Sequence, residues 1–194
     1  MKDTKTLVLL SGGMDSVALL YWLKGCFAHE VESVFFNYGA NHRTQERRFA
    51  EHHSDALGIN LHKIQLPNLQ GSKLVGDDSE SWVVPARNSV LLSFAANFAE
   101  SHGFDRIAYG CNADDADEFP DCRPGFVDAF NQTLEQAKLH VRVFAPFVYE
   151  TKRNIVSIAT HMHYPLRDSW SCYNDRSEPC GQCPACKKRN AVLP

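Results

Sequence analysis

The 194-residue sequence has no apolar run long enough to cross a membrane, no secretory signal pattern and no large excess of one charge. A membrane-spanning helix needs about 20 consecutive apolar residues, and a signal peptide needs a small-residue cleavage site after its apolar core. The formal net charge is −3, which gives no overall attraction to nucleic acid or to anionic lipid. We therefore expect a cytoplasmic protein that uses neither nucleic acid nor a membrane as its partner.

Two common phosphate-binding patterns are also missing. No Gly-Lys-Ser or Gly-Lys-Thr follows a glycine-rich turn, which excludes the usual P-loop, and no GxGxxG indicates a dinucleotide site. Internal repeats and low-complexity tracts are absent as well, so a solenoid or an array is excluded. The apolar share of 44% and the charged share of 22% are typical of one globular domain with a full core.

Apolar runs alternate with amphipathic segments along the chain. We predict strands at Thr6–Leu10, Val31–Asn37, Ile59–Leu66, Asp105–Cys111 and Val141–Phe147. We predict helices at Met14–Lys24, Arg43–Leu57, Arg87–Ser101, Pro124 to about Leu139, and Thr151–His163. This order favours an α/β fold with a doubly wound, mostly parallel five-stranded sheet. In such sheets, ligands bind beyond the carboxyl ends of the strands.

The string SGGMDS, Ser11 to Ser16, interrupts the first apolar run between a strand and a helix. At such a place, backbone N–H groups and the helix dipole can hold an anion. Gly12 and Gly13 allow close approach of the backbone, Ser11 and Ser16 can donate hydroxyls, and Asp15 could orient a serine or a magnesium-bound water. A plain turn with a serine cap is the structural alternative. The full string resembles the PP-loop of ATP pyrophosphatases, which split ATP into AMP and pyrophosphate.

Seven cysteines are present, and four of them, Cys172, Cys180, Cys183 and Cys186, lie within fifteen residues. Clustered cysteines with CxxC spacing indicate a metal site, and four thiolates suit a structural Zn²⁺ ion. Free thiols, or His161 or His163 in place of one cysteine, are the alternatives. We predict an ATP-binding α/β domain at residues 1–166 and a small zinc-binding appendage at residues 167–194, packed on the same domain.

The PP-loop and the tail SCYN…CGQCPACKKRN together resemble the 7-cyano-7-deazaguanine synthases, within the adenine nucleotide alpha hydrolase-like group of folds. Further landmarks follow in the family's order: the NYGANHR stretch from Asn37, PARN from Pro85, the strand-end Gly110, PDCR from Pro120, and Lys152. The resemblance covers nearly the whole chain.

The resemblance implies an ATP-dependent ligase. ATP with Mg²⁺ would activate the carboxylate of 7-carboxy-7-deazaguanine as an acyl adenylate, and ammonia would give the amide. A second ATP would then activate the amide oxygen, and loss of AMP would leave the nitrile. The resemblance also implies a homodimer. The alternative is a compact variant that stops at the amide or transfers the activated acid to another amine, such as one on a protein in a phage or defence setting.

The resemblance also implies roles for individual residues. It assigns pyrophosphate and ATP to Ser11, Gly12, Gly13, Met14, Asp15, Ser16, Arg87, Asn88 and Gly110. It assigns catalysis to Asp15, Asp115, Arg123 and Lys152. It assigns the deazaguanine substrate to Tyr38, Phe119, Asp121 and Arg123. Cys122 could serve as a nucleophile, although adenylation already activates the carboxyl carbon.

The chain departs from the family pattern in several places. The loop from Pro67 to Ser81 is shorter than usual, the first cysteine gap is one residue short, and Asp117-Glu118-Phe119 stands where relatives commonly carry Ser-Gly-Tyr. Two carboxylates near an anionic substrate are unexpected, because like charges repel. Two other function classes compete with the synthase. A tRNA-thiolating or lysidine-forming PP-loop ligase would need a basic RNA-binding module that no stretch supplies. A zinc-held, non-catalytic binding module would leave the intact SGGMDS unexplained.

Overall fold

The computed structural model describes residues 4–26 and 30–193. Its centre is a five-stranded parallel sheet in the order β3-β2-β1-β4-β5. The strands are β1 (Lys5–Leu9), β2 (Glu30–Asn37), β3 (Leu61–Gln65), β4 (Arg106–Ala108) and β5 (Arg142–Phe144). The predicted doubly wound α/β fold is thus confirmed. The strand order changes direction between β1 and β4, where sheets of this type open a crevice for ligands.

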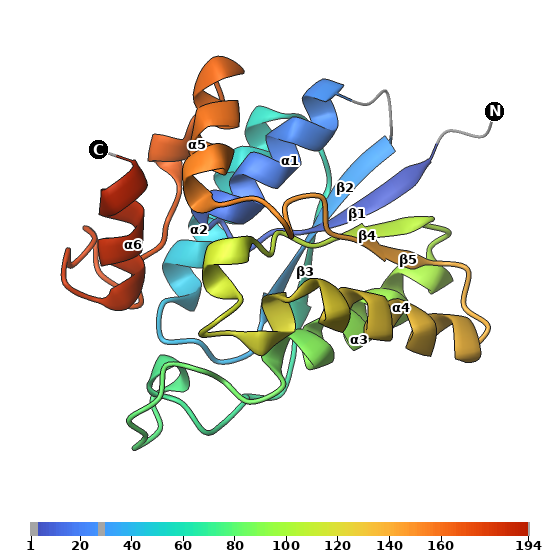
Figure 1. Cartoon of the computed structure of the whole chain (residues 1–194), viewed down its shortest axis with the longest axis horizontal. Coiled ribbons are helices and arrows are strands. Elements are labelled where there is room, and N and C mark those ends of the chain that lie inside the picture. The colour runs from blue at the N-terminus through green and yellow to red at the C-terminus, as the bar shows by residue number, and fades with distance from the viewer. Residues whose placement is uncertain (1–3, 27–29, 194) are drawn as a thin grey trace.

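Helices cover both faces of this sheet (Figure 1). α1 (Met14–Cys26), α2 (Arg43–Ala56) and α5 (Lys152–His161) lie on one face, and α3 (Arg87–Ser101) and α4 (Pro124–Gln136) lie on the other. Side chains of a strand alternate between the two faces, and β1 shows this directly. Leu7 packs into the core beneath α3 and α4, whereas Val8 packs into the core beneath α1, α2 and α5. Both cores fix the loop that follows β1.

Most element boundaries agree with the sequence to within two residues, but three differences matter. β4 and β5 are shorter than expected, and after β4 the residues Tyr109 to Cys111 leave the sheet and line a cleft. The acidic segment 112–123 contains two short 3-10 turns, Ala113–Asp115 and Pro120–Cys122. The sequence analysis missed α6 (Pro184–Val192), a helix that begins inside the cysteine cluster and packs beside α5.

Among the described residues, no helix is both long and apolar enough to cross a lipid bilayer.

Candidate active site

The PP-loop joins β1 to α1 at the point where the strand order reverses. Ser16 Oγ donates to the Gly13 carbonyl at 2.9 Å, and the hydroxyls of Ser11 and Ser16 lie 3.1 Å apart. Gly13 N donates to Ser11 Oγ at 3.3 Å. These bonds hold the loop curled over the start of α1, where helix N–H groups lack intrahelical partners. The arrangement offers backbone and hydroxyl donors to one anion.

Gly12 is required by its surroundings rather than by the turn alone. Its φ is +76°, and a Cβ atom there would lie 2.6 Å from the Glu46 carbonyl oxygen and 2.9 Å from Phe49 Cβ. Its own carbonyl accepts a hydrogen bond from Trp170 N at 2.8 Å. A residue in the tail therefore contacts the loop directly, and no side chain fits between the loop and α2.

Lys152 ties the start of α5 to the PP-loop and to the acidic segment. Thr151 caps α5 by accepting from Asn154 N, which fixes the first turn of the helix. The Lys152 ammonium donates to Asp15 Oδ2 at 2.7 Å and to Asp115 Oδ2 at 2.8 Å. The Lys152 side chain is only 9% exposed, so these contacts are largely shielded from water. The structure thus brings together three of the residues to which the resemblance assigned catalysis.

Burial and neighbouring charges set the protonation of this cluster. Burial raises the pKa of Asp15, with Asp115 adding to the rise and the Lys152 ammonium opposing it. Burial alone would raise the pKa of Asp115, but Lys152 and Lys188 hold it below its usual value. Burial would lower the pKa of Lys152, yet the two carboxylates raise it. Lys152 is therefore charged at neutral pH, and Asp115 is the firmer anion of the two aspartates.

A cleft with two chambers opens around the PP-loop. Seven residues line both chambers: Ser11, Gly13, Asp15, Glu46, Arg87, Asp115 and Cys122. The sheet-side chamber has a cavity volume of about 220 Å³ and adds Leu9, Leu10, Ser16, Val34, Phe35, Phe36, Tyr38, Asn88, Leu91, Tyr109, Gly110 and Cys111. The tail-side chamber has a cavity volume of about 200 Å³ and adds Met14, His42, Leu74, Phe119, Lys152, Trp170, Ser171, Tyr173, Ala185, Lys188 and Arg189.

The PARN and PDCR segments meet at the back of the sheet-side chamber. Asn88 Nδ2 donates to Tyr109 Oη at 2.5 Å, and Asn88 N lies 3.4 Å from Asp121 Oδ2. Tyr109 Oη donates to the Asp121 carbonyl at 3.3 Å. Ala86, just before α3, has a φ of 53°, which turns the chain so that Arg87 enters the cleft. Two motifs that are distant in sequence thus form one wall.

The residues predicted to bind the substrate lie at different depths. Tyr38 is buried, and its hydroxyl accepts from Arg87 at 3.5 Å. Phe119 lies in the tail-side chamber, with the Arg87 guanidinium carbon 6.0 Å from its ring centroid. Arg123 is exposed, donates to the Ala116 carbonyl at 2.8 Å, and lines neither chamber; Asp121 also lies outside the linings. The substrate roles of all four remain predictions.

Cys122 is an unfavourable nucleophile in this environment. It is 7% exposed, its sulfur lies 3.6 Å from Tyr109 Oη, and burial raises the pKa of its thiol to about 11. The thiolate is the reactive form of cysteine, and with this raised pKa little thiolate exists at neutral pH. Cys111, which also lines the sheet-side chamber, has its pKa raised by burial to about 12.

The acidic segment is organised by ion pairs. Asp114 Oδ2 accepts from Lys152 N at 2.8 Å, and Asn112 Nδ2 donates to Asp115 Oδ2 at 2.9 Å. Lys188, on α6, reaches Asp115 Oδ1 at 3.0 Å and Glu118 Oε2 at 2.7 Å. The unexpected Glu118 therefore has a cationic partner. Asp114, Asp115 and Glu118 therefore have protein partners and do not only face solvent.

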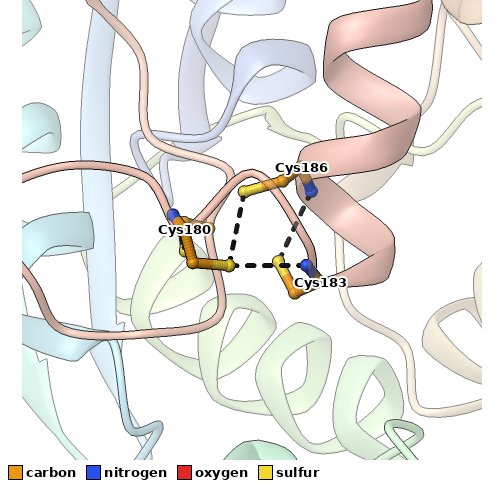
Figure 2. Close-up of side chains that lie close together, drawn as sticks. Cys180, Cys183 and Cys186 are labelled. Carbon is orange, nitrogen blue, oxygen red and sulfur yellow. Dashed lines mark hydrogen bonds between the residues drawn. The ribbon is translucent and has the colours of Figure 1, made fainter.

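The four clustered cysteines converge at the start of α6, as Figure 2 shows for three of them. Their sulfur atoms all lie within 4.8 Å of one another, and those of Cys180 and Cys186 lie 4.0 Å apart. A tetrahedral zinc with Zn–S bonds of about 2.3 Å places its sulfurs about 3.8 Å apart, so the donor set fits. Backbone N–H groups of Asn174, Cys180, Cys183 and Cys186 point at the sulfurs, which favours thiolates. The cluster can hold a metal ion.

The cysteine tail is part of the cleft. Trp170 stacks on Phe49 of α2, with ring centroids 5.8 Å apart, and its indole N–H donates to the Cys172 carbonyl at 2.8 Å. Arg189 of α6 donates to Ser169 Oγ and to the carbonyls of Leu166 and Arg167. The tail thereby supports the PP-loop from one side and presents α6 to the tail-side chamber.

Sequence reasoning missed Tyr109, Trp170 and Lys188 as parts of the cleft. Tyr109 immediately precedes Gly110 at a strand end, so its position was a signal that could have been used. The sequence analysis assigned no role to Lys188. Only the unpredicted helix α6 reveals that its side chain turns toward the acidic segment.

A parallel α/β sheet with an SGGxDS loop at its switch point defines a PP-loop-type protein. The family model of queuosine biosynthesis protein QueC matches residues 5–193, so the chain belongs to the QueC family. A 7-cyano-7-deazaguanine synthase of Pseudoalteromonas atlantica is 34% identical over 95% of this chain and 91% of its own length. A 7-cyano-7-deazaguanine synthase of Synechococcus is 33% identical over 98% of this chain and 95% of its own length. These matches confirm the predicted enzyme class, an ATP-dependent ligase of the 7-cyano-7-deazaguanine synthase family.

Solved structures support the fold. The U34-tRNA thiolase NcsA of Methanococcus maripaludis, solved with its [4Fe-4S] cluster, has a TM-score of 0.63 at 17% identity. It covers 99% of this chain, which spans 65% of the thiolase's length. An NH3-dependent NAD synthetase of Campylobacter jejuni has a TM-score of 0.55 at 10% identity, over 87% of this chain and 68% of its own. At these identities, the likeness concerns the fold alone.

Proposed function

We propose that this chain converts 7-carboxy-7-deazaguanine and ammonia into 7-cyano-7-deazaguanine at the expense of two ATP molecules. The observation that carries the proposal is the Lys152–Asp15–Asp115 cluster, which joins the PP-loop to the tail-side chamber. Membership of the QueC family supports the choice of acceptor, since the matching relatives are named for this product.

In the proposed arrangement, adenosine occupies the sheet-side chamber and the acceptor acid occupies the tail-side chamber. The sheet-side walls are largely apolar, as a flat base requires, whereas the tail-side walls carry several cations. The α-phosphate then lies between the chambers, near the residues common to both. This placement would bring the acceptor carboxylate close to the phosphorus that it attacks.

The first half of the reaction forms a mixed anhydride. A carboxylate oxygen attacks the α-phosphorus, the bond to the β-phosphate oxygen breaks, and pyrophosphate leaves toward the PP-loop hydroxyls and N–H groups. Lys152 retains one N–H donor beyond its two aspartate partners, which can meet charge that develops on the phosphates. Ammonia attacks the acyl carbon, AMP departs and a proton is released, leaving the amide.

The second half repeats the activation on the amide oxygen. That oxygen attacks a new α-phosphorus and expels pyrophosphate, and loss of AMP together with both protons of the amide nitrogen leaves the nitrile. Each of the two oxygens of the original carboxylate therefore ends in one AMP. The same donors serve both halves, because both attacks occur at the α-phosphorus beside the PP-loop.

Two metal ions belong to the proposal. Asp15 Oδ1 and Asn112 Oδ1 are buried oxygens without a hydrogen-bond partner among the described residues, and carboxylate or amide oxygens suit Mg²⁺. Bound there with ATP, Mg²⁺ would neutralise phosphate charge. Zn²⁺ is proposed for Cys172, Cys180, Cys183 and Cys186, where four thiolates leave no open position and the role is structural. The homodimer, the cytoplasmic location and the division at residue 166 remain predictions.

Product analysis tests the proposal. The purified protein is incubated with ATP, Mg²⁺, ammonium and 7-carboxy-7-deazaguanine, and the products are identified by mass spectrometry. The expected result is the nitrile with two AMP per acid. Amide with one AMP would overturn the second half of the reaction and support the compact-variant alternative. Conversion of the acid into a conjugate with another amine would also support that alternative. No ATP turnover would contradict the whole proposal.

A further inference from the structure

Glu118 and Lys188 form an ion pair at the tail-side chamber that the reaction scheme does not use. Their charged atoms lie 2.7 Å apart, and the two side chains are 36% and 35% exposed. We propose that Lys188 is the residue that binds the carboxylate of the acceptor acid, and that Glu118 holds Lys188 when the acceptor is absent. The inference rests on the proposed function and names a specificity-determining residue within it.

Lys188 is positioned by the tail and not by the sheet. It lies in the middle of α6, which starts at Pro184 with Cys183 as its N-cap and contains the cluster residue Cys186. The neighbouring residue Arg189 anchors α6 to Ser169 and to the backbone of residues 166 and 167. The Lys188 ammonium is therefore delivered to the chamber by a helix fixed at both the cysteine cluster and the preceding turn.

Among the described residues, four cations line the tail-side chamber, and the other three lie deeper in the cleft or are bonded to neighbouring protein groups. Arg189 donates to one hydroxyl and two carbonyls of its own tail. Arg87 is deep in the cleft, against the Tyr38 hydroxyl. Lys152 lies 9% exposed between Asp15 and Asp115. Lys188 is the most accessible of the described lysines in this lining, which leaves it best placed to meet a ligand from solvent.

The hydrogen-bonding capacity of Lys188 permits a third partner. An ammonium has three donors, and here one faces Asp115 at 3.0 Å and one faces Glu118 at 2.7 Å. The pair with Glu118 is partly exposed, and such pairs stabilise only weakly, so it opens readily. The contact with the less exposed Asp115 would keep the ammonium in place while Glu118 is replaced.

The chamber around Lys188 also suits the rest of the acceptor. Its ammonium lies 5.6 Å from the ring centroid of Phe119, a face on which a flat heterocycle can stack. A carboxylate attached to such a ring would reach the ammonium from the ring plane. The acceptor carboxylate would take the place of the Glu118 carboxylate on the ammonium, so Glu118 competes with an anionic substrate until its side chain turns out to solvent.

Binding measurements on the metal-loaded full chain test this assignment. Titration calorimetry compares 7-carboxy-7-deazaguanine with the uncharged 7-carboxamide on the wild type, Lys188→Met, Glu118→Gln and the exposed control Lys187→Met. We expect Lys188→Met to weaken acid binding by at least about tenfold and carboxamide binding by less than about twofold. We expect Glu118→Gln to strengthen acid binding by about threefold or more, because it removes a competitor.

The two variants move in opposite directions only if Lys188 binds the ligand. A structural brace would weaken binding of both ligands to a similar degree in both variants, and that result would overturn the assignment. Equal losses of acid and carboxamide in Lys188→Met would overturn it too. If the wild type binds ATP but neither deazaguanine, the proposed function itself fails. If the wild type binds the acid and Lys188→Met binds it equally well, only the present inference fails.

Discussion

The sheet-side and tail-side chambers share the PP-loop but differ in what builds them. The sheet-side chamber is formed by strand ends whose neighbours are core residues such as Leu10, Val34 and Phe36. The tail-side chamber is formed by side chains whose positions depend on ion pairs and on a helix that starts in a cysteine cluster. Folding of the sheet alone therefore prepares one chamber, whereas the other also needs the tail in place.

This difference separates two kinds of binding. The sheet-side chamber has the rigidity of a hydrophobic core, which is suited to a ligand common to many enzymes of this fold. In the proposed arrangement, the tail-side chamber would carry its specificity in a few charged groups that do not belong to the sheet. Glu118 and Lys188 are two such groups, since they pair with each other and not with the core.

Lys152→Met should have the largest effect, because it damages both chambers at once. Loss of the ammonium leaves Asp15 and Asp115 facing each other beside the phosphates, without the group that offsets developing charge. We expect ATP-dependent pyrophosphate release to fall by about a thousandfold or more. The exposed neighbour Arg153→Met on the same helix is the matched control, and wild-type-like rates in Lys152→Met would contradict the role assigned to the cluster.

Gly12→Ala should follow, with a loss of both stability and turnover. The residue has a positive φ, and its Cβ would lie 2.6 Å from a backbone oxygen of α2. We expect the free energy of unfolding in urea to fall by about 2–4 kcal/mol, with a loss of pyrophosphate release of about a hundredfold. Gly58→Ala provides the comparison: its φ is +61°, but a Cβ there meets nothing within 4 Å, so only the backbone strain applies. Equal losses in the two variants would show that the packing of Gly12 is irrelevant.

Removal of the metal should affect ligand binding in the tail-side chamber but not in the sheet-side chamber. The cysteine cluster holds the start of α6, so its loss should release Lys188 and Arg189 but leave the sheet intact. After chelation, we expect acceptor binding to weaken by about tenfold or more and ATP binding to change by less than about twofold. Elemental analysis should give one zinc per chain without the visible absorption of an iron–sulfur cluster. If chelation weakened ATP binding and acceptor binding equally, the two chambers would not be built independently of each other.

His53, at the junction between sheet and tail, should make a smaller contribution to stability, and this contribution should depend on pH. His53 is fully buried, with Nε2 2.6 Å from the Asp168 carbonyl and Nδ1 3.3 Å from Tyr21 Oη. Burial lowers its pKa below the ordinary 6.5, so the unfolded chain takes up the proton first as pH falls. Stability is therefore full above about pH 6.5 and decreases below it, until the pH passes the folded-state pKa.

Thermal unfolding across pH tests this dependence. His53→Gln should lower the melting temperature at neutral pH and flatten the decline between pH 6.5 and more acidic values, since the titrating group is gone. The exposed His161→Gln on α5 should retain the wild-type slope. An unchanged slope in His53→Gln would assign the acid sensitivity to other groups.

The sequence predicted the sheet-side region well and the tail-side region poorly, for a physical reason. Apolar periodicity encodes the strands and helices, and the SGGMDS string encodes the loop at the switch point, so both could be recognised locally. The cysteine cluster could also be predicted from the spacing of its members. In contrast, α6 is a short, polar helix whose stability comes from its cap and the cysteine cluster, so no periodic signal marks it.

Long-range pairing explains the remaining omissions. Lys152 and Asp15 are 137 residues apart, and Lys188 and Glu118 are 70 apart, so no local pattern could join them. The resemblance named Lys152 and Asp15 separately, and the folded chain shows their contact. The resemblance assigned no role to Lys188. The carboxylate of its partner Glu118 was unexpected until α6 was seen to place a cation beside it.

The central claim is that the PP-loop directs attack by a carboxylate on the α-phosphorus of ATP. The most direct measurement uses 7-carboxy-7-deazaguanine labelled with oxygen-18 at both carboxylate oxygens, with mass analysis of the AMP formed. We predict that every AMP carries one labelled oxygen and that the deazaguanine product retains none. Unlabelled AMP, or ADP in place of AMP, would contradict adenylation of the acid by this protein.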